Sequence, residues 1–127
     1  MHDLLAPGGF LYLSEFHPIA DMLGDDEPIP VHDYFATGPL RFEEPGSYAA
    51  PGEVTTYNVT VEWQHSIGRV LTALLASGLR LEMFHEWDST LFDRCSCLVR
   101  GDDGGRRWPG PGTLPLMYYL KAVRPAL

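Results

Sequence analysis

Basic side chains are scarce in the first half of this 127-residue chain, and their scarcity excludes one class of partner. Residues 1–62 contain eleven acidic residues and a single base, Arg41, whereas residues 63–127 contain six acidic residues and eight bases. The whole chain carries a formal net charge of −8. An acidic surface repels phosphate backbones, so we expect no nucleic acid to bind this chain directly.

Long hydrophobic runs and a secretory leader are also lacking. No stretch of about eighteen apolar residues occurs, so we expect no segment to span a membrane. The first residues have neither the basic stretch nor the apolar core of a signal peptide, which predicts a cytoplasmic protein. The two cysteines, Cys95 and Cys97, are one residue apart and point to opposite faces of an extended chain. We therefore expect reduced thiols, and no metal site, since zinc motifs space their cysteines further apart.

The residues that are present suffice for one domain, with 45% hydrophobic and 12% aromatic residues. Residues 10–13, Phe-Leu-Tyr-Leu, form a continuous apolar run typical of a parallel strand buried on both faces of an α/β sheet. The run follows Pro7 and two glycines, which typically end a helix. Because nine residues precede the run, we expect an incomplete sheet.

Periodic patterns predict the other elements. Apolar residues at helical spacing predict a helix over residues 66–77, with Ser66 as its N-cap and Gly78 at its end. Apolar residues at every second position predict strands over residues 54–63 and 79–87, and a last strand covers residues 117–123. Residues 102–105 are expected at a hairpin tip. The proline-containing, aromatic residues 17–52 are predicted to form a loop or cap inserted into the domain.

The order of these elements and three motifs resemble the C-terminal half of a bacterial class I S-adenosylmethionine-dependent methyltransferase. Leu-Leu-Ala-Pro-Gly-Gly at residues 4–9 matches the family's turn, Leu-Leu-x-Pro-Gly-Gly. Residues 74–79 are similar to its helix-to-strand junction, with leucine where an aromatic residue is usual, and residues 114–125 resemble its last strand. The resemblance implies an α/β fold: a partial Rossmann-like sheet of the family's last three strands, the final one antiparallel between the others, with at least one packed helix. Residues 1–127 would then be a single incomplete domain.

The resemblance also implies what this chain does not hold. The family binds S-adenosylmethionine with a glycine-rich loop after its first strand and an acidic residue after its second, and this chain contains neither motif. S-adenosylmethionine is therefore implied for the complete enzyme, and weak or no binding is predicted for this chain. One interpretation is the C-terminal part of a methyltransferase for a small-molecule acceptor, not competent alone. The other is a non-catalytic remnant or interaction protein that pairs through an exposed sheet edge, as a homodimer or with a complementing chain.

Two residue pairs are candidates for the site. Glu15 and His17 follow the first predicted strand, and ligands of α/β sheets bind beyond the carboxyl ends of the strands. We predict that this pair is catalytic and orients the acceptor or takes its proton. In the alternative, His17 caps a turn and Glu15 is solvated. Tyr34 and Phe35 are predicted to line a small-molecule pocket, or else to pack the long loop onto the domain.

Overall fold

A computed structural model of the chain describes residues 2–24, 29–46 and 52–126. Parts of the predicted insertion, residues 25–28 and 47–51, lie outside the described residues. The elements, in chain order, are η1 (His2–Leu4), β1 (Phe10–Phe16), α1 (Pro18–Met22), β2 (Leu40–Glu43), β3 (Val59–Glu62), α2 (Ile67–Ala76), β4 (Arg80–Trp87), β5 (Ser89–Thr90), β6 (Val99–Arg100), β7 (Arg106–Arg107) and β8 (Met117–Val123).

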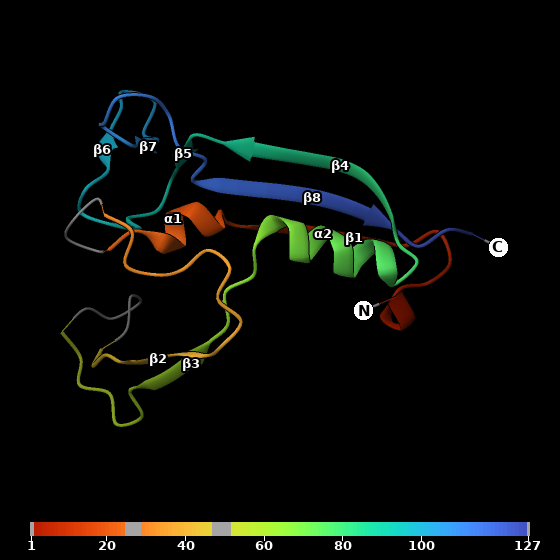
Figure 1. The fold of residues 1–127 in the computed structure, drawn as a ribbon, viewed down its shortest axis with the longest axis horizontal. Coiled ribbons are helices and arrows are strands. Elements are labelled where there is room, and N and C mark those ends of the chain that lie inside the picture. Colours follow the sequence, from red (N-terminus) through yellow and green to blue (C-terminus); the bar gives the residue numbers. More distant parts are fainter. Residues whose placement is uncertain (1, 25–28, 47–51, 127) are drawn as a thin grey trace.

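The largest sheet has the order β1-β8-β4, and β8 is antiparallel to both neighbours (Figure 1). Leu120 of β8 lies between Leu13 of β1 and Phe84 of β4. The final strand thus lies between the two others, as the resemblance implies. A shift of register at residues 81–83 interrupts the pairing of β4 with β8.

Helix α2 covers one face of this sheet and forms the core with it. Ser66 caps the helix as predicted, because its Oγ accepts a hydrogen bond from the Arg69 N–H at 3.4 Å. Gly78 ends the helix with a φ of 81°, which side chains disfavour. The buried cluster consists of Leu74, Leu79, Tyr118, Leu120 and Ala122. Leu75, which the helical spacing places on the same stripe, is 57% exposed instead.

The predicted fold class, a partial Rossmann-like sheet, is wrong. The structure consists of three small sheets, and every strand pair among the described residues is antiparallel. The error comes from the apolar run of β1, which we interpreted as a parallel strand buried on both faces. Instead, β1 has one neighbour, β8, and its alternate residues Phe10 and Tyr12 are 56% and 54% exposed. An apolar run therefore did not require cover on both faces.

Two smaller sheets lie at the other end of the molecule. Strands β2 and β3 pair as a hairpin, so the predicted strand over residues 54–63 is shorter than expected. The segment after β1 is more regular than the predicted loop, because it contains α1 and β2. Strand β7 lies between β5 and β6, and residues 101–105 form the predicted hairpin tip. A disulfide joins Cys95 and Cys97, so the expectation of reduced thiols is wrong in this structure.

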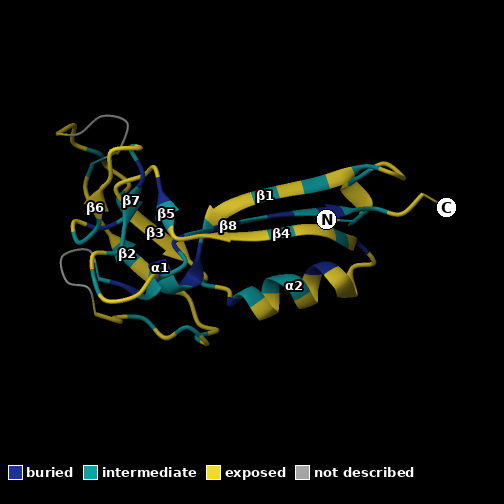
Figure 2. Cartoon of the chain, turned by 90° about the horizontal axis from the view of Figure 1, so that it is seen from above, coloured by how far each residue is buried: buried dark blue, intermediate teal, exposed yellow. Residues whose placement is uncertain are grey.

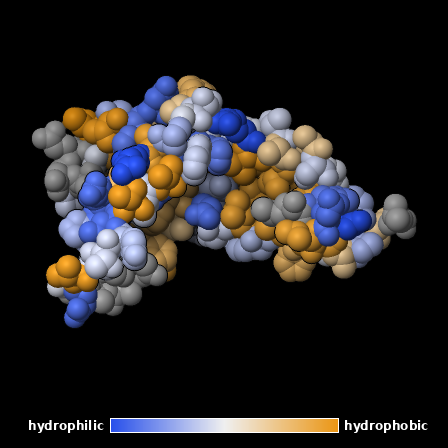
Figure 3. Space-filling view, turned by 90° about the horizontal axis from the view of Figure 1, so that it is seen from below, coloured by the Kyte–Doolittle hydropathy of each residue, from blue (hydrophilic) through white to orange (hydrophobic). Residues whose placement is uncertain are grey.

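The sheet face opposite α2 has little cover from the described residues, except at Phe16, whose ring packs against Phe92 and Arg94. We call this the open sheet face; it consists of Phe10, Tyr12, Ser14, Phe16, Met83, His85, Trp87, Met117, Tyr119, Lys121 and Val123. Figure 2 shows that β1 and β4, the borders of the sheet, are largely exposed. Seen from below, the half that holds α2 also shows patches of hydrophobic side chains (Figure 3). Among the described residues, no helix is long and apolar enough to cross a membrane.

Candidate functional site

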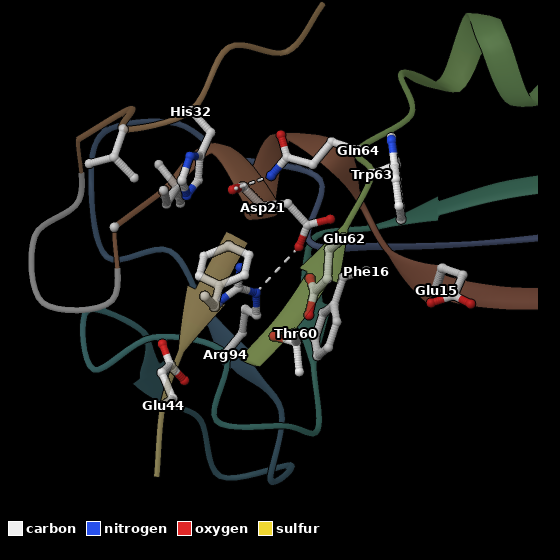
Figure 4. Close-up of a pocket in the computed structure, with 14 residues that line it drawn as sticks. Glu15, Phe16, Asp21, His32, Glu44, Thr60, Glu62, Trp63, Gln64 and Arg94 are labelled. Carbon is white, nitrogen blue, oxygen red and sulfur yellow. Dashed lines mark hydrogen bonds and ion pairs between the residues drawn. The ribbon is translucent and has the colours of Figure 1, made fainter. Parts of the chain in front are cut away.

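A cavity of about 510 Å³ opens where β1 ends (Figure 4). Its walls come from the end of β1, from α1, from the β2–β3 hairpin and from the segment before β6. The lining residues are Glu15, Phe16, Asp21, Leu23, Gly24, Val31, His32, Phe42, Glu44, Thr60, Glu62, Trp63, Gln64 and Arg94. The predicted insertion therefore forms much of a pocket beyond the carboxyl end of β1.

Hydrogen bonds to the backbone of α1 fix the walls of the cavity. The chain returns beside α1 because the N–H groups of Val31 and His32 donate to the carbonyl oxygen of Met22. The second residue after β3 approaches from the other side, where Gln64 Nε2 donates to the Asp21 carbonyl oxygen at 3.1 Å. Both connections join segments on either side of the β2–β3 hairpin to one short helix, so the pocket depends on the fold of α1.

The polar centre of the cavity is an ion pair between Asp21 and Arg94. Arg94 Nε lies 3.3 Å from Asp21 Oδ1, and both side chains are largely shielded from solvent. Burial raises the pKa of Asp21 above its ordinary value, while Arg94 opposes this shift. The Arg94 guanidinium also lies over the Phe16 ring, 5.9 Å from its centre. The cavity therefore already holds one cation against a carboxylate and an aromatic face.

The predicted catalytic pair is divided between two environments. Glu15 is exposed and lines the cavity, whereas His17 is only 2% exposed and lies outside the lining. The Nδ1 atom of His17 accepts a hydrogen bond from the Ile19 N–H at 3.1 Å, which makes His17 the N-cap of α1. Nε2 then donates to Glu86 Oε1 at 2.9 Å. Because both ring nitrogens are engaged, His17 positions α1 and Glu86, and its ring offers no free lone pair to a substrate.

Tyr34 and Phe35 do not line the cavity. Their rings pack edge to face with centres 4.9 Å apart, and the Tyr34 hydroxyl accepts a hydrogen bond from the Ile67 N–H at 3.3 Å. Ile67 is the first residue of α2, so Tyr34 satisfies one of the free N–H groups at that helix end. Phe35 is exposed. The structure thus places this pair where the loop packs onto the domain.

The aromatic and charged walls include residues that the sequence analysis did not select. Phe42 and Trp63 supply the rings that we expected from Tyr34 and Phe35, and Asp21 and Arg94 supply the charges. Trp63 ends the alternating segment that predicted a strand, so its position at a strand end was a usable signal. Asp21 and Arg94 are 73 residues apart in sequence, and no local pattern connects them.

Comparisons with known proteins identify no family for this chain. No family model matches it, and no curated protein is similar to it. Among the residues that the structure describes, no group of three or more histidine, cysteine, aspartate or glutamate side chains could hold a metal ion. The function must therefore be argued from the cavity and from the open sheet face.

Acidification is expected to destabilise the fold through His17. Burial lowers the pKa of His17, although the hydrogen bond to Glu86 and the charge of Asp21 oppose the shift. The folded state therefore binds a proton less readily than the unfolded state, whose histidine titrates near about pH 6.5. The stability from neutral His17 is present above that pH and is lost as the pH falls below it. Urea unfolding between about pH 7.5 and pH 5 should show this decline.

A matched pair of variants checks the assignment. His17→Asn keeps an oxygen that can cap α1 but cannot titrate, so the decline should be smaller in this variant. His65→Asn removes an exposed histidine and should keep the decline of the unmodified chain. Equal pH profiles for the unmodified chain and His17→Asn would contradict the assignment to His17.

Proposed function

We propose that this chain is the acceptor-binding, C-terminal part of an S-adenosylmethionine-dependent methyltransferase that acts on a small molecule. The observation that carries the proposal is the cavity beyond the carboxyl end of β1, beside a sheet in which the last strand lies between β1 and β4. The resemblance implies this strand order, with the final strand antiparallel between the other two. Within the cavity, the Glu15 and Glu62 carboxylates can accept a hydrogen bond or a proton from an acceptor.

The described residues offer no cradle for S-adenosylmethionine. The turn at Gly8 and Gly9 leads into β1 rather than from a strand into a helix, as a cofactor loop would. The glycines of residues 101–105 form a hairpin tip between β6 and β7, where Asp103 pairs with Arg107 at 2.7 Å. The proposal therefore assigns the cofactor to residues outside this chain, and this chain supplies acceptor binding.

Titration with S-adenosylmethionine tests the proposal in two steps. Because the described residues offer no cofactor cradle, we expect calorimetry to give a dissociation constant weaker than about 100 μM, against about 1 μM for a formed site. The coding sequence upstream of Met1 should then encode a glycine-rich loop, and the longer product should bind the cofactor and methylate small molecules. Low-micromolar binding by this chain would contradict the division of roles. A longer product with that loop that binds no cofactor would contradict the methyltransferase proposal.

A second candidate function, an interaction protein, rests on the open sheet face. Tyr119 at its centre stacks on Tyr12 and on His85, with ring centres 5.8 Å and 5.1 Å apart. Trp87 lies beside this cluster and is half exposed. Exposed apolar faces of this kind are typical of contact surfaces. Failure of the cofactor experiments together with stable self-association would favour this candidate.

A further inference from the structure

The cavity contains more negative than positive charge. Its lining has four carboxylates, on Glu15, Asp21, Glu44 and Glu62, and one guanidinium, on Arg94. Arg94 is already paired with Asp21. No ion pair of the described residues includes the three glutamates, and the residues outside that description contain no lysine, arginine or histidine. Three carboxylates therefore have no cationic side chain as partner.

Aromatic residues line the same cavity as these carboxylates. Phe42 lies on β2 beside Glu44, and Trp63 follows Glu62 directly at the end of β3. The faces of aromatic rings attract cations. In this cavity the Phe16 ring already contacts one, the Arg94 guanidinium. Carboxylates next to aromatic rings recognise a cation with an apolar body, because the rings contact the body and the carboxylates pair with the charge.

The positions of the carboxylates distinguish an organic cation from a metal ion. Asp21 and Glu62 approach the middle of the pocket, whereas Glu44 and Glu15 lie toward opposite sides of it (Figure 4). The described residues contain no group of three that could hold a metal ion. Separated carboxylates can instead pair with separated positive charges along one molecule. Phosphorylated or carboxylated molecules would be repelled, since a single guanidinium faces four carboxylates.

We infer that the cavity binds a small organic cation with one or two protonated amino groups on an aliphatic body. Only the role of this molecule as a methyl acceptor rests on the proposed function; its binding does not. The carboxylates favour the protonated amine, which has no lone pair to attack a methyl group. The ammonium group is therefore the anchor, and a different atom of the molecule would receive the methyl group.

Titration with 1,4-diaminobutane tests the inference on the full chain. At pH 7 and an ionic strength of about 0.15 M, calorimetry should give a dissociation constant below about 1 mM, which corresponds to about −4 kcal/mol. The double variant Glu44→Gln/Glu62→Gln should bind at least about tenfold more weakly, since it removes two carboxylates of the lining. Butane-1,4-diol, which has the same carbon chain and no charge, should not bind measurably.

Matched controls separate a site from general attraction to an acidic protein. The double variant Glu43→Gln/Glu53→Gln removes the same charge from glutamates outside the lining, and Glu43, the last residue of β2, directly precedes Glu44. It should change the affinity less than about twofold, because bulk charge is largely screened. Circular dichroism should show that all variants fold.

Three outcomes would overturn the inference: an equal loss in both double variants, binding of the diol as tight as that of the diamine, or tighter binding of Mg²⁺ alone. The two proposals fail separately. A longer product that binds the diamine but transfers no methyl group would contradict the methyltransferase proposal and support the cation site. A longer product that transfers methyl groups but does not bind the diamine would contradict the cation site and support the methyltransferase proposal.

Discussion

Replacing Leu120 with alanine is expected to lower the free energy of unfolding by about 2–5 kcal/mol. Leu120 has no exposed surface and lies in the central strand β8, between β1 and β4 and beneath α2. The truncated side chain leaves a void that three elements would have to close together. A domain of this size is typically stable by about 5–15 kcal/mol, so the loss is a large fraction of the total. Urea unfolding followed by circular dichroism measures it.

Leu75→Ala is the matched control, because it deletes the same atoms from the exposed side of α2. We expect a loss of at most about 0.5 kcal/mol, as for other surface substitutions. The comparison also tests the packing of the helix, since the spacing of the sequence places Leu75 on the apolar stripe and the structure does not. Similar losses for Leu75→Ala and Leu120→Ala would contradict the described orientation of α2.

The sequence predicted the strands and the helix of the main sheet more accurately than it predicted the fold class. A continuous apolar run located β1, and helical spacing and alternation located α2 and β4, each to within a few residues, because these patterns are local properties of the chain. The fold class failed because it depended on what surrounds the apolar run of β1. That run packs Leu11 and Leu13 toward α2 and leaves Phe10 and Tyr12 outside. Four apolar letters do not distinguish this arrangement from burial on both faces.

The sequence analysis selected the end of β1, which adjoins the cavity, but it did not select most of the side chains that line it. The end of β1 does adjoin the cavity, and Glu15 lines it. The role of His17 depends on Ile19 and Glu86, and the alternative that it caps a turn describes its observed contacts. The Asp21–Arg94 pair joins α1 to a segment near β6, so only the tertiary fold brings it together. Charge was the useful early signal, since the acidic first half of the sequence supplies all four carboxylates of the cavity.

We expect the chain to associate with itself through the unpaired edge of β1. Strand β1 pairs only with β8 among the described strands, so one edge has no strand partner. The described part of residues 17–52 gathers around the cavity at the end of β1 and pairs with no residue of that strand. An apolar edge strand is a template for pairing, and two copies of β1 could join about a two-fold axis. Sedimentation at micromolar concentration should therefore give about twice the chain mass of 14.2 kDa.

The hydrogen-bond pattern of β1 designates the variant that tests this association. The Gly9 carbonyl oxygen accepts a hydrogen bond from the Arg124 N–H, and the His17 N–H donates to the Leu116 carbonyl oxygen, at the two ends of β8. The backbone N–H and C=O groups of the odd-numbered residues of β1 therefore point toward β8, and the N–H of Ser14 points away from it, toward the free edge. Ser14→Pro removes this outward donor without removing a bond to β8, as prolines in edge strands do. We expect it to weaken association by at least about tenfold, equivalent to about 1.4 kcal/mol, whereas Ser14→Ala keeps the N–H and the association. A monomeric unmodified chain at these concentrations, or a Ser14→Pro variant that associates as the unmodified chain does, would show that the edge of β1 is not the contact.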